Sequence, residues 1–276
     1  MLLYDLHCHS TRSDGLLAPS DVVARAAERG VRVLALTDHD EMGGLREARD
    51  EATALGLTFV NGVEISVTWG GRTLHVIGLQ IDPENPELAN GLEQIRRGRH
   101  HRAETIASGL EAAGISGSLA GARSYVTNPE LVGRTHFARF LVERGHARDV
   151  HSVFSRYLTA GRPGYVSHQW ASLAQAVQWI KASGGVAVLA HPGRYGLNNA
   201  ERESLLSSFA ALGGSAVEVV TGSHTPDQYA TWAGYARRHG LLASAGSDFH
   251  GPQESRRDFG ELPDLPAGCA PVWRAF

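Results

Sequence analysis

The stretch ASGGVAVLAH (residues 182–191) contains three signals of one structural unit. A helical pattern ends at a glycine pair, and glycine is the residue best suited to the left-handed conformation just past a helix. A short run rich in valine follows, as is typical of a buried strand. A histidine, His191, stands directly after this run. The stretch therefore predicts a helix, then a strand, with a polar side chain at the carboxyl end of the strand.

The same order of helix, glycine and apolar run occurs at four other places in the chain. The four apolar runs cover residues 31–37, 57–64, 215–220 and 241–248. Two more apolar runs, 2–7 and 73–79, bring the predicted strands to seven. Helices that alternate with continuous apolar strands predict an α/β fold with a parallel sheet, either closed as a barrel or open.

The alternation stops between residues 93 and 163, where the pattern is helical and basic. Residues 94–163 hold eleven arginines and five acidic residues, whereas the whole chain has a net charge of −3. We expect residues 93–163 to be an insertion after the fourth strand, so that the barrel domain comprises residues 1–92 and 164–276. On composition alone the insertion is either a cap that binds an anionic substrate or a solvated helical surface.

Composition also excludes several classes of protein. No run of about 18 apolar residues is present, and the amino terminus lacks the pattern of a secretory signal. Two cysteines, Cys8 and Cys269, are too few for a disulfide framework. We therefore expect a cytoplasmic protein without membrane contact, and nothing in the sequence implies a protein partner.

Histidine or acidic residues end five of the predicted strands. They are His7 and His9, His39, Glu64, His191, and Asp248 with His250. The carboxyl edge of parallel strands carries the active site in α/β barrels. In an extended chain His7 and His9 face one side and Cys8 faces the other, so we expect Cys8 to pack as a small apolar residue.

Imidazole and carboxylate ligands without thiolate suit divalent ions such as Mn²⁺, Zn²⁺ or Fe²⁺. The set is larger than one ion needs, which indicates two or three ions. Such a site activates water and stabilises both the attacking and the leaving oxygen of a phosphate ester. The residues therefore predict a metal-dependent hydrolase.

These motifs resemble those of the polymerase and histidinol phosphatase (PHP) family. The matching motifs are His7-Cys8-His9-Ser10, Ser13-Asp14-Gly15, Thr37-Asp38-His39-Asp40, Gly62-Val63-Glu64, His75 within a strand, Ala190-His191-Pro192 and Gly246-Ser247-Asp248-Phe249-His250. The resemblance covers the whole barrel and implies a distorted (β/α)7 barrel with a helical insertion. It also implies a phosphoesterase with two or three divalent ions, Mn²⁺ first and Zn²⁺, Fe²⁺ or Mg²⁺ as alternatives.

The resemblance implies the following ligands. The first ion would be held by His7, His9, Glu64 and Asp248, the second by Glu64, His75 and His191, and the third by Asp14, His39 and His250. Catalysis would rest on Asp14, His39, His191, Asp248 and His250, and Asp38 and Asp40 would orient His39. Several family members have histidine where this chain has Asp14, and an oxygen ligand there favours Mn²⁺ or Mg²⁺.

One subgroup of the family shares further features with the insertion and the later barrel. They are the stretches 132–139, 157–158 and 163–166, together with Gly161, Glu218 and Gly222-Ser223-His224. Members of this subgroup remove a phosphate from nucleoside 3′,5′-bisphosphates or degrade 5′-phosphorylated RNA from its 5′ end. The resemblance thus implies removal of the 3′-phosphate from a nucleotide bisphosphate, and short 5′-phosphorylated RNA as a second substrate.

A bisphosphate needs a second anion site, and the arginine fork binds phosphate bidentately. Our candidates for substrate contacts are Arg99, Arg102, Arg134, Thr135, His136 and His224. Arg99 and Arg102, three apart on a helix, either bind phosphate or lie on a solvated face. His224 either protonates a leaving oxygen or is hydrogen-bonded within a loop.

Two other functions fit the same motifs. One is a phosphatase of histidinol phosphate or another small phosphomonoester, and the basic insertion favours a nucleotide over it. The other is a barrel that binds nucleic acid through metal without catalysis. Because every expected ligand position carries a competent side chain, the sequence favours an enzyme.

Overall fold

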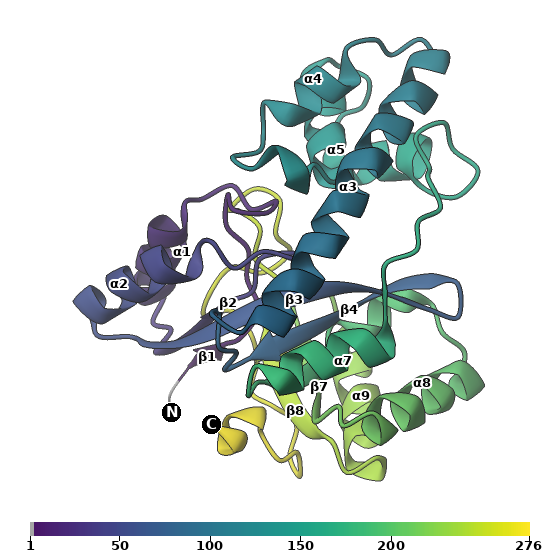
Figure 1. Ribbon diagram of the computed structural model, residues 1–276. Helices are drawn as coiled ribbons and strands as arrows, with labels where there is room; N and C mark the ends of the chain where they lie inside the picture. Colours follow the sequence, from purple (N-terminus) through teal and green to yellow (C-terminus); the bar gives the residue numbers. More distant parts are fainter. Residues whose placement is uncertain (1–2) are drawn as a thin grey trace.

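An eight-stranded sheet forms the centre of the protein in the computed structural model, which describes residues 3–276 (Figure 1). Seven strands lie in the order β1 (Tyr4–Asp5), β2 (Val33–Leu36), β3 (Thr58–Trp69), β4 (Arg72–Leu79), β6 (Val186–Leu189), β7 (Ala216–Thr221) and β8 (Leu242–Gly246). A short strand, β5 (Ala171–Ser172), pairs with β3 outside this order. All seven predicted strands are present, and Leu2 of the first lies outside the described residues.

The two ends of this sheet meet, so the sheet is nearly closed into a barrel. The Leu6 amide donates to the Ala245 carbonyl at 3.0 Å, and the His9 amide donates to the Phe249 carbonyl at 2.8 Å. At the other end of this seam, the Ala243 amide donates to the Ala270 carbonyl at 2.8 Å. The carboxyl-terminal segment therefore completes the wall where β1 is too short to do so, and the barrel expected from the sequence is confirmed.

One part of the predicted topology is wrong, because the sheet is not wholly parallel. Strand β4 runs antiparallel to both β3 and β6. It follows β3 through Gly70 and Gly71, which have positive φ angles of 55° and 74°. A two-residue turn of this kind joins antiparallel strands, whereas a parallel pair needs a long crossover. Glu64 also lies inside β3 rather than at its end.

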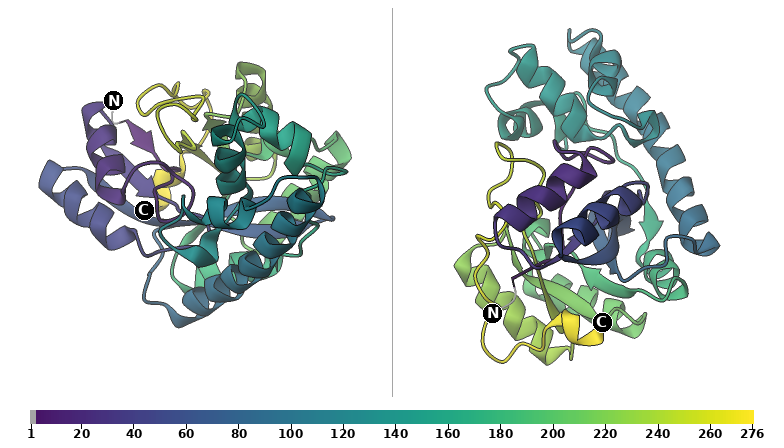
Figure 2. Two further views of the ribbon diagram at one scale, coloured as in Figure 1. Left: turned by 90° about the horizontal axis from the view of Figure 1, so that it is seen from above. Right: turned by 90° about the vertical axis from the view of Figure 1, so that its left-hand side faces the viewer.

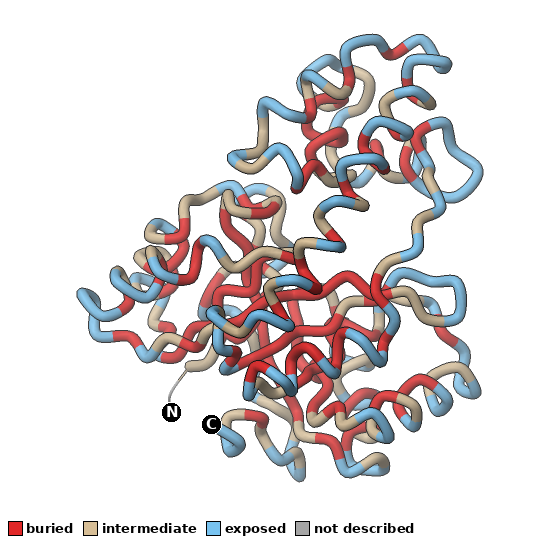
Figure 3. The backbone as a smooth tube through the Cα atoms, viewed as in Figure 1, coloured by how far each residue is buried: buried red, intermediate tan, exposed pale blue. Residues whose placement is uncertain are grey.

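Helices cover the outside of the barrel and leave one end free for the insertion. Helices α1 (Pro19–Glu28) and α2 (Leu45–Leu55) pack together on one side, and α7 (Leu173–Ala182), α8 (Asn199–Ala211) and α9 (Pro226–Arg238) lie on the other (Figures 1 and 2). The buried backbone is concentrated in the sheet between these helices (Figure 3). None of the helices in residues 3–276 is both long enough and apolar enough to cross a membrane.

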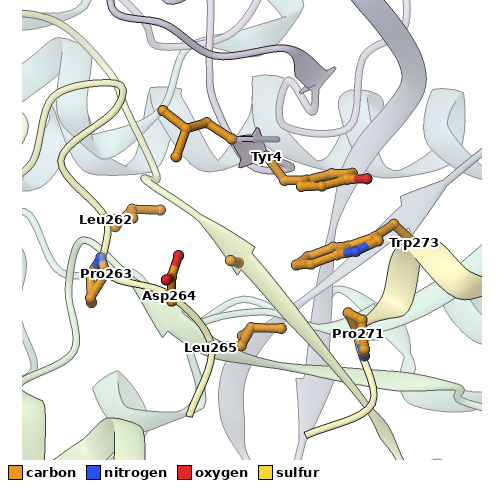
Figure 4. Close-up of a pocket in the computed structure, with 9 residues that line it drawn as sticks. Tyr4, Leu262, Pro263, Asp264, Leu265, Pro271 and Trp273 are labelled. Atoms are coloured by element: carbon orange, nitrogen blue, oxygen red, sulfur yellow. The ribbon is translucent and has the colours of Figure 1, made fainter. Parts of the chain in front are cut away.

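The barrel interior is apolar at the end away from the insertion. Leu6, Val33 and Val188 form part of a buried cluster there, which Val272 of the turn η4 (Val272–Ala275) also joins. Beside it, Trp273 stacks on Tyr4 with ring centroids 4.0 Å apart. These two rings border an apolar pocket of about 410 Å³ (Figure 4). The polar residues predicted for the site are not among its lining residues.

The insertion follows β4 and begins with the long helix α3 (Pro86–Ala112). The first part of α3 contributes Leu88 and Leu92 to the barrel core, whereas Ile106 and Leu110 belong to a second hydrophobic core. The remaining elements around the second core are α4 (Ser118–Arg123), η1 (Pro129–Leu131), α5 (Arg134–Glu143), α6 (Val150–Val153) and the π-helical turn η2 (Phe154–Leu158). Helix α3 therefore belongs to both lobes, and we call the outer lobe, residues 103–166, the cap.

The seam between β1 and β8 depends on a glycine. A Cβ atom on Gly246 would lie 2.3 Å from the His7 Cβ and 2.6 Å from the His7 nitrogen. We predict that Gly246→Ala lowers the free energy of unfolding by about 1–3 kcal/mol, because the neighbouring backbone has to move. Urea denaturation measures this change.

A matched control is Gly234→Ala in α9, where a new Cβ would have only the flexible Arg238 guanidinium near it, at 3.5 Å. This variant should be more stable by about 0.5–1 kcal/mol, since alanine favours the helix. A Gly246→Ala protein as stable as the parent would show that the seam does not need this close contact.

Candidate metal centre

The nine side chains predicted as metal ligands converge at the cap-facing end of the barrel. They follow β1 (His7, His9 and Asp14), β2 (His39), β6 (His191) and β8 (Asp248 and His250), or lie within β3 (Glu64) and β4 (His75). Because β4 is antiparallel, His75 near its start pairs with Ser66, two residues beyond Glu64 on β3. The reversed strand thus brings its histidine to the edge where the parallel strands end.

Glu64 is the centre of this cluster. Its Oε1 lies 2.9 Å from both His75 Nδ1 and His191 Nε2. Its Oε2 lies 2.9 Å from His39 Nδ1 and 3.3 Å from His9 Nε2. Burial would raise the pKa of this carboxyl, but the imidazoles, His75 and His39 foremost, hold it well below its usual range. A carboxylate with imidazole nitrogens close to both of its oxygens can bridge two ions.

The two aspartates of the cluster each direct one oxygen at imidazoles. Asp248 Oδ1 lies 3.4 Å from the Nε2 atoms of His7 and His9. Asp14 Oδ1 lies 3.2 Å from His250 Nε2 and 3.8 Å from His39 Nε2. Among residues 3–276 neither oxygen has a hydrogen-bond partner, although both are buried.

These atoms form four overlapping groups whose donors lie within 4.8 Å of one another. The groups are His9-Asp14-His39-His250, His7-His191-Asp248, His7-His9-Glu64 and His39-Glu64-His75. Buried oxygens without donors, surrounded by imidazole nitrogens, need a cation to offset their desolvation. The donor set is the one that borderline and hard divalent ions prefer. The residues therefore fit a centre of several divalent ions.

Two of these residues have strained backbones. His191 has a φ of 26° and Asp248 a φ of 57°, and neither is a glycine. Positive φ at such residues costs about 1–3 kcal/mol and is found mainly at functional sites. The strained backbone at these two residues directs their side chains into the cluster.

Buried acids behind the cluster orient its histidines and its first loop. Glu218 on β7 accepts from His7 Nδ1 at 2.9 Å and from the His191 amide at 2.5 Å. Glu218 is one of the features shared with the subgroup, but it was not among the predicted site residues, although an acid inside an apolar run is an available signal. Second partners of this kind fix the orientation of metal-binding histidines.

Asp38 and Asp40 do not have the predicted role of orienting His39. Asp38 accepts from the amide of Ser10 at 2.8 Å and from the hydroxyl of Ser13 at 2.6 Å, so it holds the loop that carries Asp14. Asp40 accepts from Ser66 and Arg99. The chain bends away after His39, which turns the flanking carboxylates toward other elements.

Of the three arginines predicted to bind substrate, Arg99 is already engaged within the protein. Its Nε donates to Asp40 Oδ2 at 2.8 Å, and its Nη2 donates to Ser66 Oγ at 2.8 Å. It also lies over the Trp170 ring, 4.8 Å from the centroid. Arg99 therefore joins the first part of α3 to β3, and its fork is not free for phosphate.

Arg102 and Arg134 are in the opposite situation. Arg102 is buried over Trp170, Arg134 is half-buried over Phe154, and within residues 3–276 neither forms an ion pair with a carboxylate. Burial and the charges of Arg134 and Arg99 lower the pKa of Arg102 to about 9. Burial likewise lowers the pKa of Arg134. Two such arginines, without an acidic partner among the described residues, are a candidate site for an anion.

The other three predicted substrate residues contact the protein itself. Thr135 donates to Asp14 Oδ2 at 2.9 Å. His136 Nδ1 accepts from the Gly133 amide at 3.0 Å, and burial lowers its pKa to about 4. His224 has Nδ1 3.1 Å from the Val219 carbonyl, and its Nε2 accepts from the Gly193 amide at 2.9 Å. The geometry of His224 is thus that of a hydrogen-bonded loop histidine.

A further cation at the rim of the cluster was missed from the sequence. Arg194 lies in the turn η3 (Pro192–Tyr195) directly after His191 and is half exposed. Its Nη1 donates to Asp248 Oδ2 at 2.9 Å. The sequence could have indicated Arg194, because it follows the predicted ligand His191 by only three residues. A half-exposed cation at this position is within reach of an anion bound at the cluster.

This fold and this cluster match those of a known family. The model of the PHP domain matches residues 5–203, so the chain belongs to the PHP domain family. It is 54% identical over 270 residues to a 3′,5′-nucleoside bisphosphate phosphatase of Chromobacterium violaceum, with 98% of this chain and 95% of the relative covered.

Two further comparisons agree with this assignment. The chain is 44% identical over 277 residues to the 5′-3′ exoribonuclease Rnm of Escherichia coli, covering 100% of this chain and 94% of the relative. A solved structure described as an amidohydrolase from Chromobacterium violaceum, with bound sulfate and no metal, has a TM-score of 0.96 at 53% identity. That alignment covers 99% of this chain and 95% of the other.

Cys8, between two ligands, provides a test of the cluster. Cys8 is fully buried, and its Sγ donates to the Ala35 carbonyl at 3.2 Å rather than facing the clustered side chains. We predict that Cys8→Ala keeps the metal content of the parent, whereas His9→Ala loses at least one ion per chain. Elemental analysis of protein dialysed against Mn²⁺ measures both. Metal loss in Cys8→Ala, or full content in His9→Ala, would contradict the assignment.

Proposed function

We propose that this protein is a metal-dependent phosphoesterase that removes the 3′-phosphate from nucleoside 3′,5′-bisphosphates, with short 5′-phosphorylated RNA as a second substrate. The observation that carries the proposal is a pair of arginines, the buried Arg102 and the half-buried Arg134, which have no carboxylate partner among residues 3–276. The same chain also holds the carboxylate and imidazole cluster. The names of the two relatives support both substrates.

We propose further that the nine clustered side chains hold two or three divalent ions, with Mn²⁺ preferred. The share of carboxylate oxygens, including that of Asp14, favours Mn²⁺ over softer ions. Bound there, divalent ions would supply a water nucleophile at neutral pH and offset charge on the phosphoryl oxygens. Glu64, with imidazole nitrogens within 2.9 Å of both of its oxygens, is the proposed bridge.

The protein's own residues divide the work of binding. Arg194 is suited to contact the phosphoryl group that reacts, because its side chain is half exposed and its guanidinium lies beside the proposed ligand Asp248. Arg102 and Arg134 are suited to hold the second phosphate, which pairs bidentately with arginine forks. Burial first, and the charges of Arg99 and Arg194 after it, lower the pKa of Arg134. A substrate with two phosphates satisfies both cationic positions.

The test is a comparison of three substrates at equal concentration: adenosine 3′,5′-bisphosphate, a short 5′-phosphorylated RNA, and histidinol phosphate. We expect the bisphosphate to be hydrolysed fastest and histidinol phosphate slowest. His7→Ala and Asp248→Ala should abolish hydrolysis together with metal binding, because each removes a donor from the cluster. Faster turnover of histidinol phosphate, or full activity of both variants after chelation, would reject the proposal.

The second phosphate site gives a separate prediction. Arg134→Gln should raise KM for adenosine 3′,5′-bisphosphate about tenfold to a hundredfold, because a hydrogen bond between a charged guanidinium and a phosphate is lost. The KM for adenosine 3′-monophosphate, which has no second phosphate, should change little. Steady-state kinetics on the two nucleotides measures the difference.

Arg123→Gln is the matched control, because it removes one cap charge from an exposed position of α4. It should leave both KM values unchanged. Equal effects of Arg134→Gln on the two nucleotides would show that Arg134 does not recognise the second phosphate.

A further inference from the structure

Asp14 is held from two sides by different parts of the fold. Its Oδ1 faces the barrel cluster, 3.2 Å from His250 Nε2. Its Oδ2 accepts a hydrogen bond from Thr135 Oγ1 at 2.9 Å. Thr135 belongs to α5 of the cap, more than a hundred residues further along the chain. A cap hydroxyl thus determines which carboxylate oxygen is left for a cation.

The backbone of Asp14 is held by the same helix. Arg139, one turn after Thr135, donates from Nη2 to the Asp14 carbonyl at 2.6 Å. The same guanidinium binds Glu254, with its Nε 2.9 Å from Oε1 and its Nη2 2.8 Å from Oε2. Successive turns of α5 therefore contact the side chain and the main chain of one predicted ligand.

The contact between Asp14 and Thr135 also stabilises the amino terminus of α5. Its N-cap is Gly133, which has no side chain to cap the helix, and its first turn contains no acidic residue. A carboxylate beside a helix amino terminus is favourable because of the helix dipole. Asp14 provides that charge, so the attachment of the cap and the orientation of the carboxylate depend on one another.

We propose that Thr135 is a positioning residue for the metal centre. Its hydroxyl holds Asp14 Oδ2 and thereby sets the affinity of the ion bound by His9, Asp14, His39 and His250. Without this bond the carboxylate is free to rotate, and Oδ1 no longer points at the imidazoles. Partners of this kind change metal affinity about tenfold to a hundredfold. The inference rests on the metal centre proposed above.

The test measures Mn²⁺ binding to metal-free protein by calorimetric titration and by elemental analysis after dialysis. The ion in question is the one lost in Asp14→Ala. Thr135→Val has nearly the same shape but no hydroxyl, and it should bind this ion about tenfold more weakly while binding the others as the parent does. Thr135→Ser should restore the affinity, since it keeps the hydroxyl.

Thr127→Val is the matched control. The Thr127 hydroxyl donates to the Thr11 carbonyl at 2.8 Å, a second hydrogen bond from the insertion to the same segment, but not to a proposed ligand. This variant should bind every ion as the parent does. Thermal unfolding of the metal-free proteins shows that the variants are folded, and Thr135→Ala replaces Thr135→Val if the latter is not.

Each remaining outcome counts against the inference. Unchanged affinity in Thr135→Val, or no rescue by Thr135→Ser, would overturn it while leaving the metal centre intact. Equal weakening of all ions, or the same loss in Thr127→Val, would show a general structural effect and would also overturn it. Failure of the parent protein to bind any ion would instead reject the proposed function.

Discussion

The buried carboxylate of Glu64 is the constraint on which the site depends. It is fully buried, and five imidazoles approach it within 3.4 Å, those of His7, His9, His39, His75 and His191. A buried anion is strongly unfavourable unless cations or donors surround it. The strands that carry these histidines must therefore meet around β3, and only a nearly closed sheet brings them all to one carboxylate.

The departures from a regular α/β barrel follow from that requirement. Strand β4 reverses after a two-glycine turn, which places His75 beside Glu64 without a crossover helix. His191 and Asp248 have positive φ angles. Hydrogen bonds around them, such as the one that the His191 amide donates to Glu218, offset this strain. The carboxyl-terminal segment closes the opposite end and keeps polar residues out of the apolar interior.

The insertion is a structural part of the centre as well as a cover for it. Arg99 joins α3 to Asp40 and Ser66 of the barrel, and α5 contacts Asp14 directly. Arg102 and Arg134, on the same two helices as these anchoring residues, have no acidic partner in the part of the chain that the structure describes. The basic residues of α3 and α5 thus have two roles. Arginines that pair with a carboxylate attach the insertion to the barrel, and those without such a partner form the proposed anion site.

The sequence by itself determined the strands, the insertion and seven of the nine clustered donors, whereas Asp14 and His75 were implied by the family resemblance. These depend on local rules: glycine ends a helix, β-branched runs form buried strands, and polar residues at strand ends meet at one edge. His7, Cys8 and His9 illustrate this, because alternation along an extended chain already separated the two histidines from the buried thiol.

Only the tertiary structure decided the direction of β4, the engagement of Arg99, and the contacts of Glu218, Thr135 and His224. Each of these features depends on contacts between residues distant in the chain, such as those of Thr135 with Asp14 and of Arg99 with Asp40. Hydrogen-bond partners of that kind are set by how whole elements pack. A residue type restricts the bonds a side chain can make, but packing selects among them.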